Sequence, residues 1–162
     1  MKTELTLIPS RRPLSGPPDW WRHLAPAAEG GASETHSAKG QRILIVEDDL
    51  LVADQMEAAL SDAGFDVAGT ATTREEALQL AEMKSPTLVV MDISLRGDAD
   101  GIDTALDLFR LQGIRCIFAS AYSDHEAQRR AAPAAPLGWL QKPYTMASLT
   151  AMVRAAFSEL RS

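Results

Sequence analysis

The sequence has one cysteine among 162 residues and no apolar run longer than four or five residues. A single cysteine excludes an internal disulfide, and Cys116 lies within an apolar run, where a small buried side chain is expected. Runs this short are far below the roughly 20 residues of a membrane span. The N-terminal stretch Met1–Ile8 also lacks the long apolar core of a secretory signal. We therefore expect a cytoplasmic protein with no membrane partner.

Positive charge is scarce over most of the chain. Residues 41–162 hold eleven Lys and Arg against eighteen Asp and Glu, a net charge of −7, whereas residues 1–40 have a net charge of +1. An acidic body lacks the basic footprint of a nucleic-acid-binding protein. We therefore expect proteins and a cation as partners, and no direct contact with nucleic acid.

Proline and glycine are concentrated at the N-terminus, where residues 1–40 contain five of the nine prolines and four of the ten glycines. This composition predicts a flexible, mostly disordered arm over 1–40 and a folded domain over 41–162. The arm contains the adjacent pair Trp20 and Trp21. Two interpretations of this pair stay open: it packs back onto the domain's own apolar surface, or it anchors a partner.

From residue 41 onward, short apolar runs alternate with helical periods. The runs predict strands at 43–46, 65–70, 88–91, 115–119 and 138–141. The periods predict helices at 50–63, 73–84, 102–111, 124–132 and 145–160. On the first helix we expect Gly64 to follow the last turn, and these residues to face the sheet: Leu51, Met56, Ala59 and Leu60.

Five β–α units in about 120 residues predict an α/β domain with a five-stranded parallel sheet and helices on both faces. The expected strand order is 2-1-3-4-5, that of the flavodoxin-like fold, which puts the switch point between the first and third strands. Ligands of open α/β sheets bind at the carboxyl ends of the strands, beside this switch point.

Acidic residues stand at the ends of these two strands. Glu47 and Asp48 follow the first strand, and Asp92 follows the third. Carboxylates gathered at one open edge favour Mg²⁺, which takes few protein ligands and keeps several waters. We expect Asp48 and Asp92 as direct ligands, the backbone carbonyl of Ser94 as a third, and Glu47 acting through water. Asp49 is expected to point away and cap the first helix, and the lack of His or Cys argues against zinc.

A hydroxyl and an ammonium end the other two strands. Ser120 follows the fourth and Lys142 the fifth. A metal site needs neither, but a transient phosphoryl group at Asp92 needs a point charge and a hydrogen-bond donor near it. Each of these residues alone is an ordinary turn residue. The prediction rests on all of them meeting at one edge.

These motifs resemble those of a known family. Residues 41–162 look like the receiver domain of a bacterial two-component response regulator, on the run Ile43–Asp49, on Asp92, on Ser120-Ala121 and on Gln141-Lys142-Pro143. The resemblance implies that Glu47 and Asp48 form the acid pair, Asp92 is phosphorylated, Ser120 is the switch hydroxyl and Lys142 is the paired lysine. It also makes Trp139 a candidate switch aromatic, although a simple core tryptophan fits as well.

Two stretches depart from the family pattern. Many receivers have Met-Pro where this chain has Leu95-Arg96, and the loop to Gly101 looks one residue longer, so we expect a more mobile loop. The stretch Phe118–Tyr122 loosely resembles a signature of single-domain and stress-response receivers. We expect Tyr122 to shield the phosphoryl group from water and to slow its loss.

The resemblance implies a stand-alone phosphoacceptor that is phosphorylated on Asp92 by a sensor histidine kinase or a phosphotransfer protein in a Mg²⁺-dependent reaction. It would be a signalling protein and no enzyme, acting on an unidentified downstream protein, with homodimerisation as an option. The first alternative is a pseudo-receiver, an interaction module that is never phosphorylated. The second is a Mg²⁺-dependent phosphohydrolase of the haloacid-dehalogenase kind, which would need an acid where this chain has Ser94.

Overall fold

The computed structural model describes residues 40–162, apart from 98 and 122–124. Nearly all of the predicted arm therefore lies outside the described residues, and its disorder stays a prediction. Strands and helices alternate along the domain as follows: β1 (Arg42–Val46), α1 (Leu50–Asp62), β2 (Asp66–Ala71), α2 (Arg74–Lys84), β3 (Leu88–Asp92), α3 (Gly101–Gln112), β4 (Cys116–Ser120), α4 (His125–Ala131), the 3₁₀ turn η2 (Ala132–Ala134), β5 (Gly138–Gln141) and α5 (Met146–Leu160). No helix in the described part of the chain is long and apolar enough to cross a membrane.

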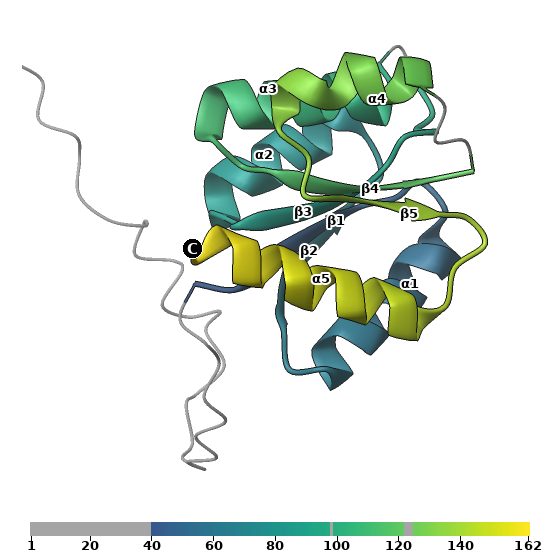
Figure 1. The fold of residues 1–162 in the computed structure, drawn as a ribbon, viewed down its shortest axis with the longest axis vertical. Helices are drawn as coiled ribbons and strands as arrows, with labels where there is room; N and C mark the ends of the chain where they lie inside the picture. Colours follow the sequence, from purple (N-terminus) through teal and green to yellow (C-terminus); the bar gives the residue numbers. More distant parts are fainter. Residues whose placement is uncertain (1–39, 98, 122–124) are drawn as a thin grey trace, which may run out of the picture. The chain divides into compact units, whose positions relative to one another are not determined.

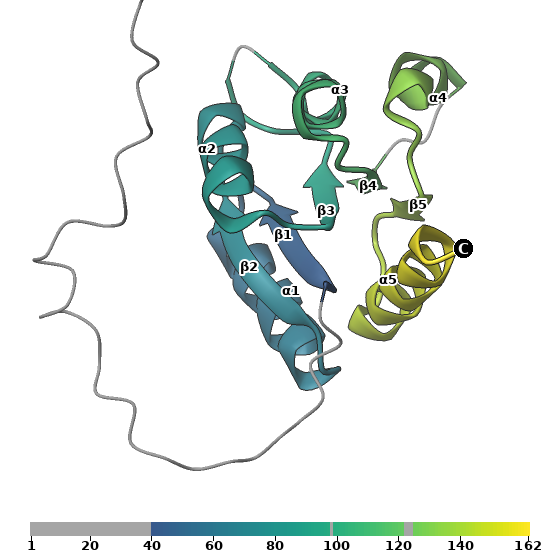
Figure 2. The same cartoon turned by 90° about the vertical axis from the view of Figure 1, so that its left-hand side faces the viewer.

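The five strands form one parallel sheet in the order β2-β1-β3-β4-β5, so the predicted flavodoxin-like topology is confirmed. In Figure 1, α2, α3 and α4 cover one face of the sheet and α1 and α5 cover the other. Figure 2 shows the same layers from the side, with α5 next to the edge strand β5. Since parallel strands in register end together, the residues that follow them lie along one rim.

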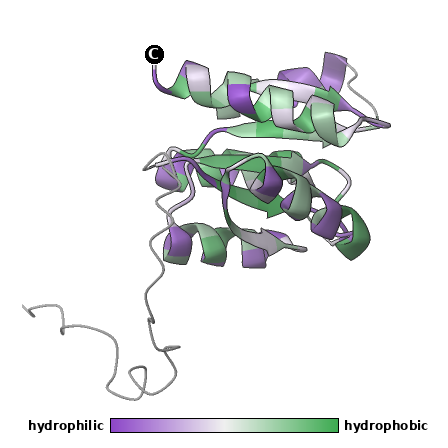
Figure 3. Ribbon diagram, turned by 90° about the horizontal axis from the view of Figure 1, so that it is seen from below, coloured by the Kyte–Doolittle hydropathy of each residue, from purple (hydrophilic) through white to green (hydrophobic). Residues whose placement is uncertain are grey.

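The core lies on both faces of the sheet, because successive strand residues point to opposite sides. Leu44, Met91 and Phe118 pack toward α2, α3 and α4, whereas Ile45 and Val90 pack toward α1 and α5. These five side chains are fully buried, and each contributes on the order of 1.5–3 kcal/mol of hydrophobic stabilisation. In Figure 3 the strands are largely green and lie between helices whose surfaces carry most of the purple.

The structure confirms most of the prediction for the first helix, α1, but contradicts it at Leu51. Met56 and Leu60 are buried against the sheet, Ala59 is half-buried, and Gly64 follows the last turn with φ +91°. Leu51, however, is 70% exposed, so its predicted position toward the sheet is wrong. At about 100° per residue, Leu51 lies about 140° around the helix from Met56. The buried stripe continues instead through Ala53.

The other boundaries differ from the predictions by a residue or two. Asp92 and Ser120 are the last residues of β3 and β4, where the sequence suggested that they follow these strands. The predicted fourth helix, 124–132, is described as α4 and then η2, and position 124 lies outside the described residues. Thr73 caps α2, its side chain accepting from the Glu76 N–H, and the Glu76 carboxylate accepts from the Thr72 N–H and hydroxyl.

Candidate functional site

Three consecutive acids follow β1, and their side chains have different partners. The Glu47 N–H donates to the Ala71 carbonyl of β2 at 2.9 Å, which continues the sheet and leaves the Glu47 side chain buried. The Glu47 carboxylate accepts from the Asp49 N–H at 3.1 Å. Asp49 caps α1, accepting from the N–H groups of Leu51 and Val52, as predicted. Asp48 lies between them with a side chain that is 15% exposed.

Asp92 ends β3 with a buried carboxylate whose Oδ1 accepts from the Ser94 N–H at 3.1 Å. The backbone of Asp92 is covered by the start of α3, because the Gly101 N–H donates to the Ile93 carbonyl at 2.9 Å. A Cβ added at Gly101 would lie 1.9 Å from the Asp92 carbonyl oxygen. Only glycine allows this approach.

Lys142 joins the two acidic strand ends. The backbone N–H of Lys142 donates to the Ser120 carbonyl at 2.8 Å, which fixes the Lys142 backbone beside β4. Its ammonium lies 3.2 Å from Asp92 Oδ1 and 3.4 Å from Glu47 Oε2. Lys142 therefore links Asp92 and Glu47 as one charged group.

The pKa values of this group follow from burial and charge. Burial raises the pKa of Glu47, and the nearby Asp92 charge adds to the effect, while the Asp49 N–H and Lys142 act against it. For Lys142, burial works to lower the pKa, but the charges of Asp92 and Glu47 outweigh it and leave the pKa raised. The Lys142 ammonium therefore stays charged beside the negative charges of Asp92 and Glu47.

Glu47, Asp48 and Asp92 offer carboxylate oxygens that all lie within 4.8 Å of one another. Among the described residues, no His or Cys belongs to this cluster. A compact set of hard oxygen donors fits Mg²⁺ and does not fit zinc, which prefers nitrogen and sulfur. The predicted carboxylate ligands are thus brought together.

Two further predicted residues, Ser120 and Trp139, lie on β4 and β5. Ser120 is buried at the end of β4. The half-buried Trp139 ring stacks on Phe118, with centroids 4.7 Å apart and planes at 28°. Trp139 therefore packs against the core beside the rim. The predicted switch residue Tyr122 lies outside the described residues.

Three residues that were not predicted as site residues lie at or beside the site. Arg96 Nε lies 3.1 Å from Asp48 Oδ2, an ion pair that the loop sequence alone gave no reason to expect. Gly101 packs on Asp92, and its signal was a helix-disfavouring glycine placed directly after the capping Asp100. The half-buried Tyr144 donates its hydroxyl to Met56 Sδ at 3.6 Å, and burial raises its pKa.

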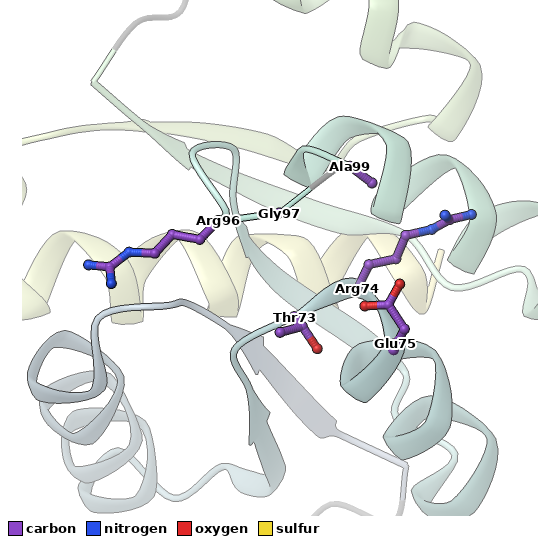
Figure 4. A pocket seen from close by; sticks show the side chains of 6 residues that line it. All are labelled: Thr73, Arg74, Glu75, Arg96, Gly97 and Ala99. Carbon is purple, nitrogen blue, oxygen red and sulfur yellow. The ribbon is translucent and has the colours of Figure 1, made fainter.

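Beside Arg96 the surface is hollowed into a pocket of about 320 Å³ between the β3–α3 loop and the first turn of α2. Figure 4 shows the Arg96 side chain extending away from Arg74 and Glu75, which lie on the other side of this pocket.

The fold and this acidic rim define a signalling receiver. The chain belongs to the response regulator receiver domain family, whose family model matches residues 43–154. It is 30% identical over 132 residues to the transcriptional regulatory protein PdtaR of Mycobacterium tuberculosis, covering 82% of this chain and 64% of PdtaR. It is 35% identical over 115 residues to the phyllosphere-induced regulator PhyR of Methylorubrum extorquens, covering 70% of this chain and 42% of PhyR. The chain thus spans less than two thirds of the length of both relatives.

Solved structures agree with this assignment. The signal receiver domain of a modulated diguanylate cyclase from Desulfovibrio desulfuricans G20 superposes with a TM-score of 0.68 at 32% identity, covering 74% of this chain and 95% of that one. A CheY-like receiver domain protein from Methanospirillum hungatei JF-1 gives a TM-score of 0.69 at 26% identity, covering 75% and 96%. The chain is therefore a receiver domain of the two-component response regulators. Such domains are signalling modules that bind Mg²⁺ at an acidic pocket, and the carboxylates of Glu47, Asp48 and Asp92 form an acidic cluster here.

Proposed function

We propose that Asp92 is the phosphoacceptor and that it takes its phosphoryl group from a phosphohistidine of a sensor kinase or phosphotransfer protein. The observation that carries this proposal is the position of the Asp92 carboxylate. It is buried at the end of β3, 3.2 Å from the Lys142 ammonium and within 4.8 Å of two further carboxylates. An acid that serves only as a turn residue has no need of such surroundings.

The same carboxylates would hold the cation. Asp48 and Asp92 would bind Mg²⁺ directly, with the backbone carbonyl of Ser94 as a third ligand and Glu47 acting through water. When bound, Mg²⁺ neutralises charge on the carboxylates and on the incoming phosphoryl oxygens. Glu47 suits the indirect role, since its Oε1 already accepts from the Asp49 N–H.

In the transfer itself, a carboxylate oxygen of Asp92 attacks phosphorus and forms the O–P bond as the P–N bond of the phosphohistidine breaks. The electron pair of that bond returns to the imidazole nitrogen, and an aspartyl phosphate results. Lys142 holds the Asp92 carboxylate in place before transfer and pairs with a phosphoryl oxygen afterwards. Its raised pKa keeps it charged throughout.

The signal would leave the site through β4 and β5. Ser120 ends β4, and its carbonyl accepts from the Lys142 N–H, so movement at either residue is felt by the other. The Ser120 hydroxyl would turn toward a new phosphoryl oxygen. Trp139, stacked on Phe118 two residues before Ser120, would shift with it and change the surface offered to a downstream protein.

Intact-mass measurement after incubation with acetyl phosphate and Mg²⁺ tests the proposal. Wild-type protein should gain one phosphoryl group, and Asp92→Asn should gain none. Asp54→Asn, which changes an exposed acid on α1, is the matched control and should react like wild type. Phosphorylation of Asp92→Asn at the wild-type rate would contradict the assignment of Asp92.

The two alternatives are outcomes of related measurements. Wild-type protein that accepts phosphate from neither acetyl phosphate nor a phosphorylated kinase domain would be an interaction module. Turnover of a model phosphate ester would indicate a phosphohydrolase. Against the second, position 94 is a serine whose backbone N–H binds Asp92, and a serine there supplies no carboxylic acid for the leaving group.

A further inference from the structure

Arg96 is held at the rim of the acidic cluster by the residues on either side of it. Leu95 is 8% exposed and packs into the core on the α2–α4 side of the sheet. Gly97 has φ +125°, a backbone conformation that side chains disfavour, and lies at a bend of the chain. The position of Arg96 therefore follows from an apolar anchor before it and a glycine turn after it.

The contact between Arg96 and Asp48 is unequal. The Arg96 side chain is 89% exposed, whereas that of Asp48 is 15% exposed. In the described part of the chain, Asp48 is the one acid within ion-pair distance of Arg96. Such a pair is held weakly, since the arginine keeps most of its hydration and its freedom to move. The pocket of about 320 Å³ beside it leaves room for the side chain to swing away.

The balance of charge in the cluster indicates the role of Arg96. Lys142 lies within ion-pair distance of Glu47 and Asp92, and Arg96 pairs with Asp48. Three acids are thus met by two cationic side chains. A divalent cation bound to Asp48 would stand next to the guanidinium and repel it. Arg96 and the metal therefore compete for the negative charge of Asp48.

We propose that Arg96 is a built-in competitor of Mg²⁺ for Asp48, an inference that rests on the proposed metal site. Arg96 pairs with Asp48 when the metal is absent and releases it when the metal binds. The β3–α3 loop is therefore tied to the β1–α1 junction only in the metal-free protein. Arg96 acts on the metal through Asp48, as a positioning residue that sets the affinity and reports occupancy to the loop.

Magnesium titration of the full chain followed by ¹H–¹⁵N NMR tests this proposal. In wild type, the Arg96 Nε–H signal, identified by its loss in Arg96→Lys, should move to the position of an unpaired arginine with the same midpoint as the amide signals of 48 and 92. Arg96→Ala should bind Mg²⁺ about two- to fivefold more tightly at low ionic strength. The gain should shrink at about 0.5 M salt, where exposed charges are screened.

Matched variants separate the competing explanations. Arg96→Lys keeps the charge and should stay closer to wild type than Arg96→Ala. Arg110→Ala removes an exposed arginine from the last turn of α3, away from the site, and should leave the affinity unchanged. Equal affinity in Arg96→Ala and wild type, or an Arg96 signal that stays in place at saturation, would overturn the inference and leave the metal site standing. Wild-type protein that binds no Mg²⁺ would overturn both.

Discussion

The two buried acids at the rim, Glu47 and Asp92, are tolerated because each has a cationic partner and a backbone hydrogen-bond donor. Glu47 and Asp92 are 2% and 3% exposed, and buried acids are strongly destabilising unless a cation or hydrogen-bond donors meet them. Lys142 meets both with one ammonium, and the N–H groups of Asp49 and Ser94 provide one hydrogen bond to each acid. One lysine therefore keeps both carboxylates buried.

The closest backbone approach at the site makes Gly101 a sensitive residue. Gly101→Ala would place a Cβ 1.9 Å from the Asp92 carbonyl oxygen, so the start of α3 has to move. We expect a loss of about 3 kcal/mol in the free energy of unfolding, measured by urea denaturation. Gly138→Ala is the control, because its Cβ would meet only the flexible Met152 side chain at 3.0 Å. An equal loss in both variants would contradict the explanation.

Because of the buried Cys116 thiol, the stability of the folded protein should depend on pH in the alkaline range. Burial raises the pKa of this thiol from 9.0 to about 12. Between these values the unfolded thiol loses its proton and the folded one keeps it, so stability falls as pH rises from 9 to 12. The fall due to this group approaches about 4 kcal/mol at its upper end. Urea denaturation across this range should show a shallower decline in Cys116→Ala, and parallel declines would argue against a buried thiol.

At the scale of helices and strands, the prediction from sequence succeeded where a repeating pattern was long. The alternation of apolar runs and helical periods predicted all ten strands and helices within a few residues, and the register of the parallel strands then brought Glu47, Asp92 and Lys142 together. The prediction that Leu51 faces the sheet was wrong because Leu51 lies in the first turn, where a short apolar stretch does not show which side of the helix is buried.

Contacts made by loops were out of reach for a different reason. The Arg96–Asp48 pair joins two connections that have no periodicity, and its geometry depends on the turn at Gly97. The packing of Gly101 on Asp92 depends on how closely α3 approaches β3, a tertiary distance that no local pattern encodes. Strand ends can be predicted from a sequence, whereas the side chains that loops bring to them cannot.

Adjacent acids at the start of α1 have separable roles. Asp49→Ala removes the side chain that accepts from Leu51 and Val52 at 3.0 and 3.3 Å, which should cost about 1 kcal/mol of stability. Since the Asp49 N–H that binds Glu47 is retained, Mg²⁺ affinity should stay near the wild-type value. Asp48→Ala should show the reverse, with weak Mg²⁺ binding and an intact helix cap. Urea denaturation and a Mg²⁺ titration of both variants distinguish the two, and loss of metal binding in Asp49→Ala would contradict the division.

For the molecule as a whole, cation binding should appear as added stability. A ligand that binds only the folded state stabilises it by about 2.7 kcal/mol at a hundred times its dissociation constant. Thermal unfolding of the full chain should therefore shift upward with Mg²⁺ concentration, and chelation should reverse the shift. Asp48→Asn should shift far less, because it removes a carboxylate of the cluster. A midpoint that ignores Mg²⁺ in wild type would contradict a specific site.

The order of the sheet also decides which strand moves most easily. The central strand β3, which carries Asp92, has a neighbour along both sides, whereas β5, which leads from Trp139 to Lys142, pairs only with β4 in the described sheet. Displacing β5 disturbs one ladder of hydrogen bonds, and displacing β3 disturbs two. In the proposed function, the central strand would hold Asp92 in place while the edge strand β5 moves, so a downstream protein that binds along β5 would detect a phosphoryl group without reaching the site.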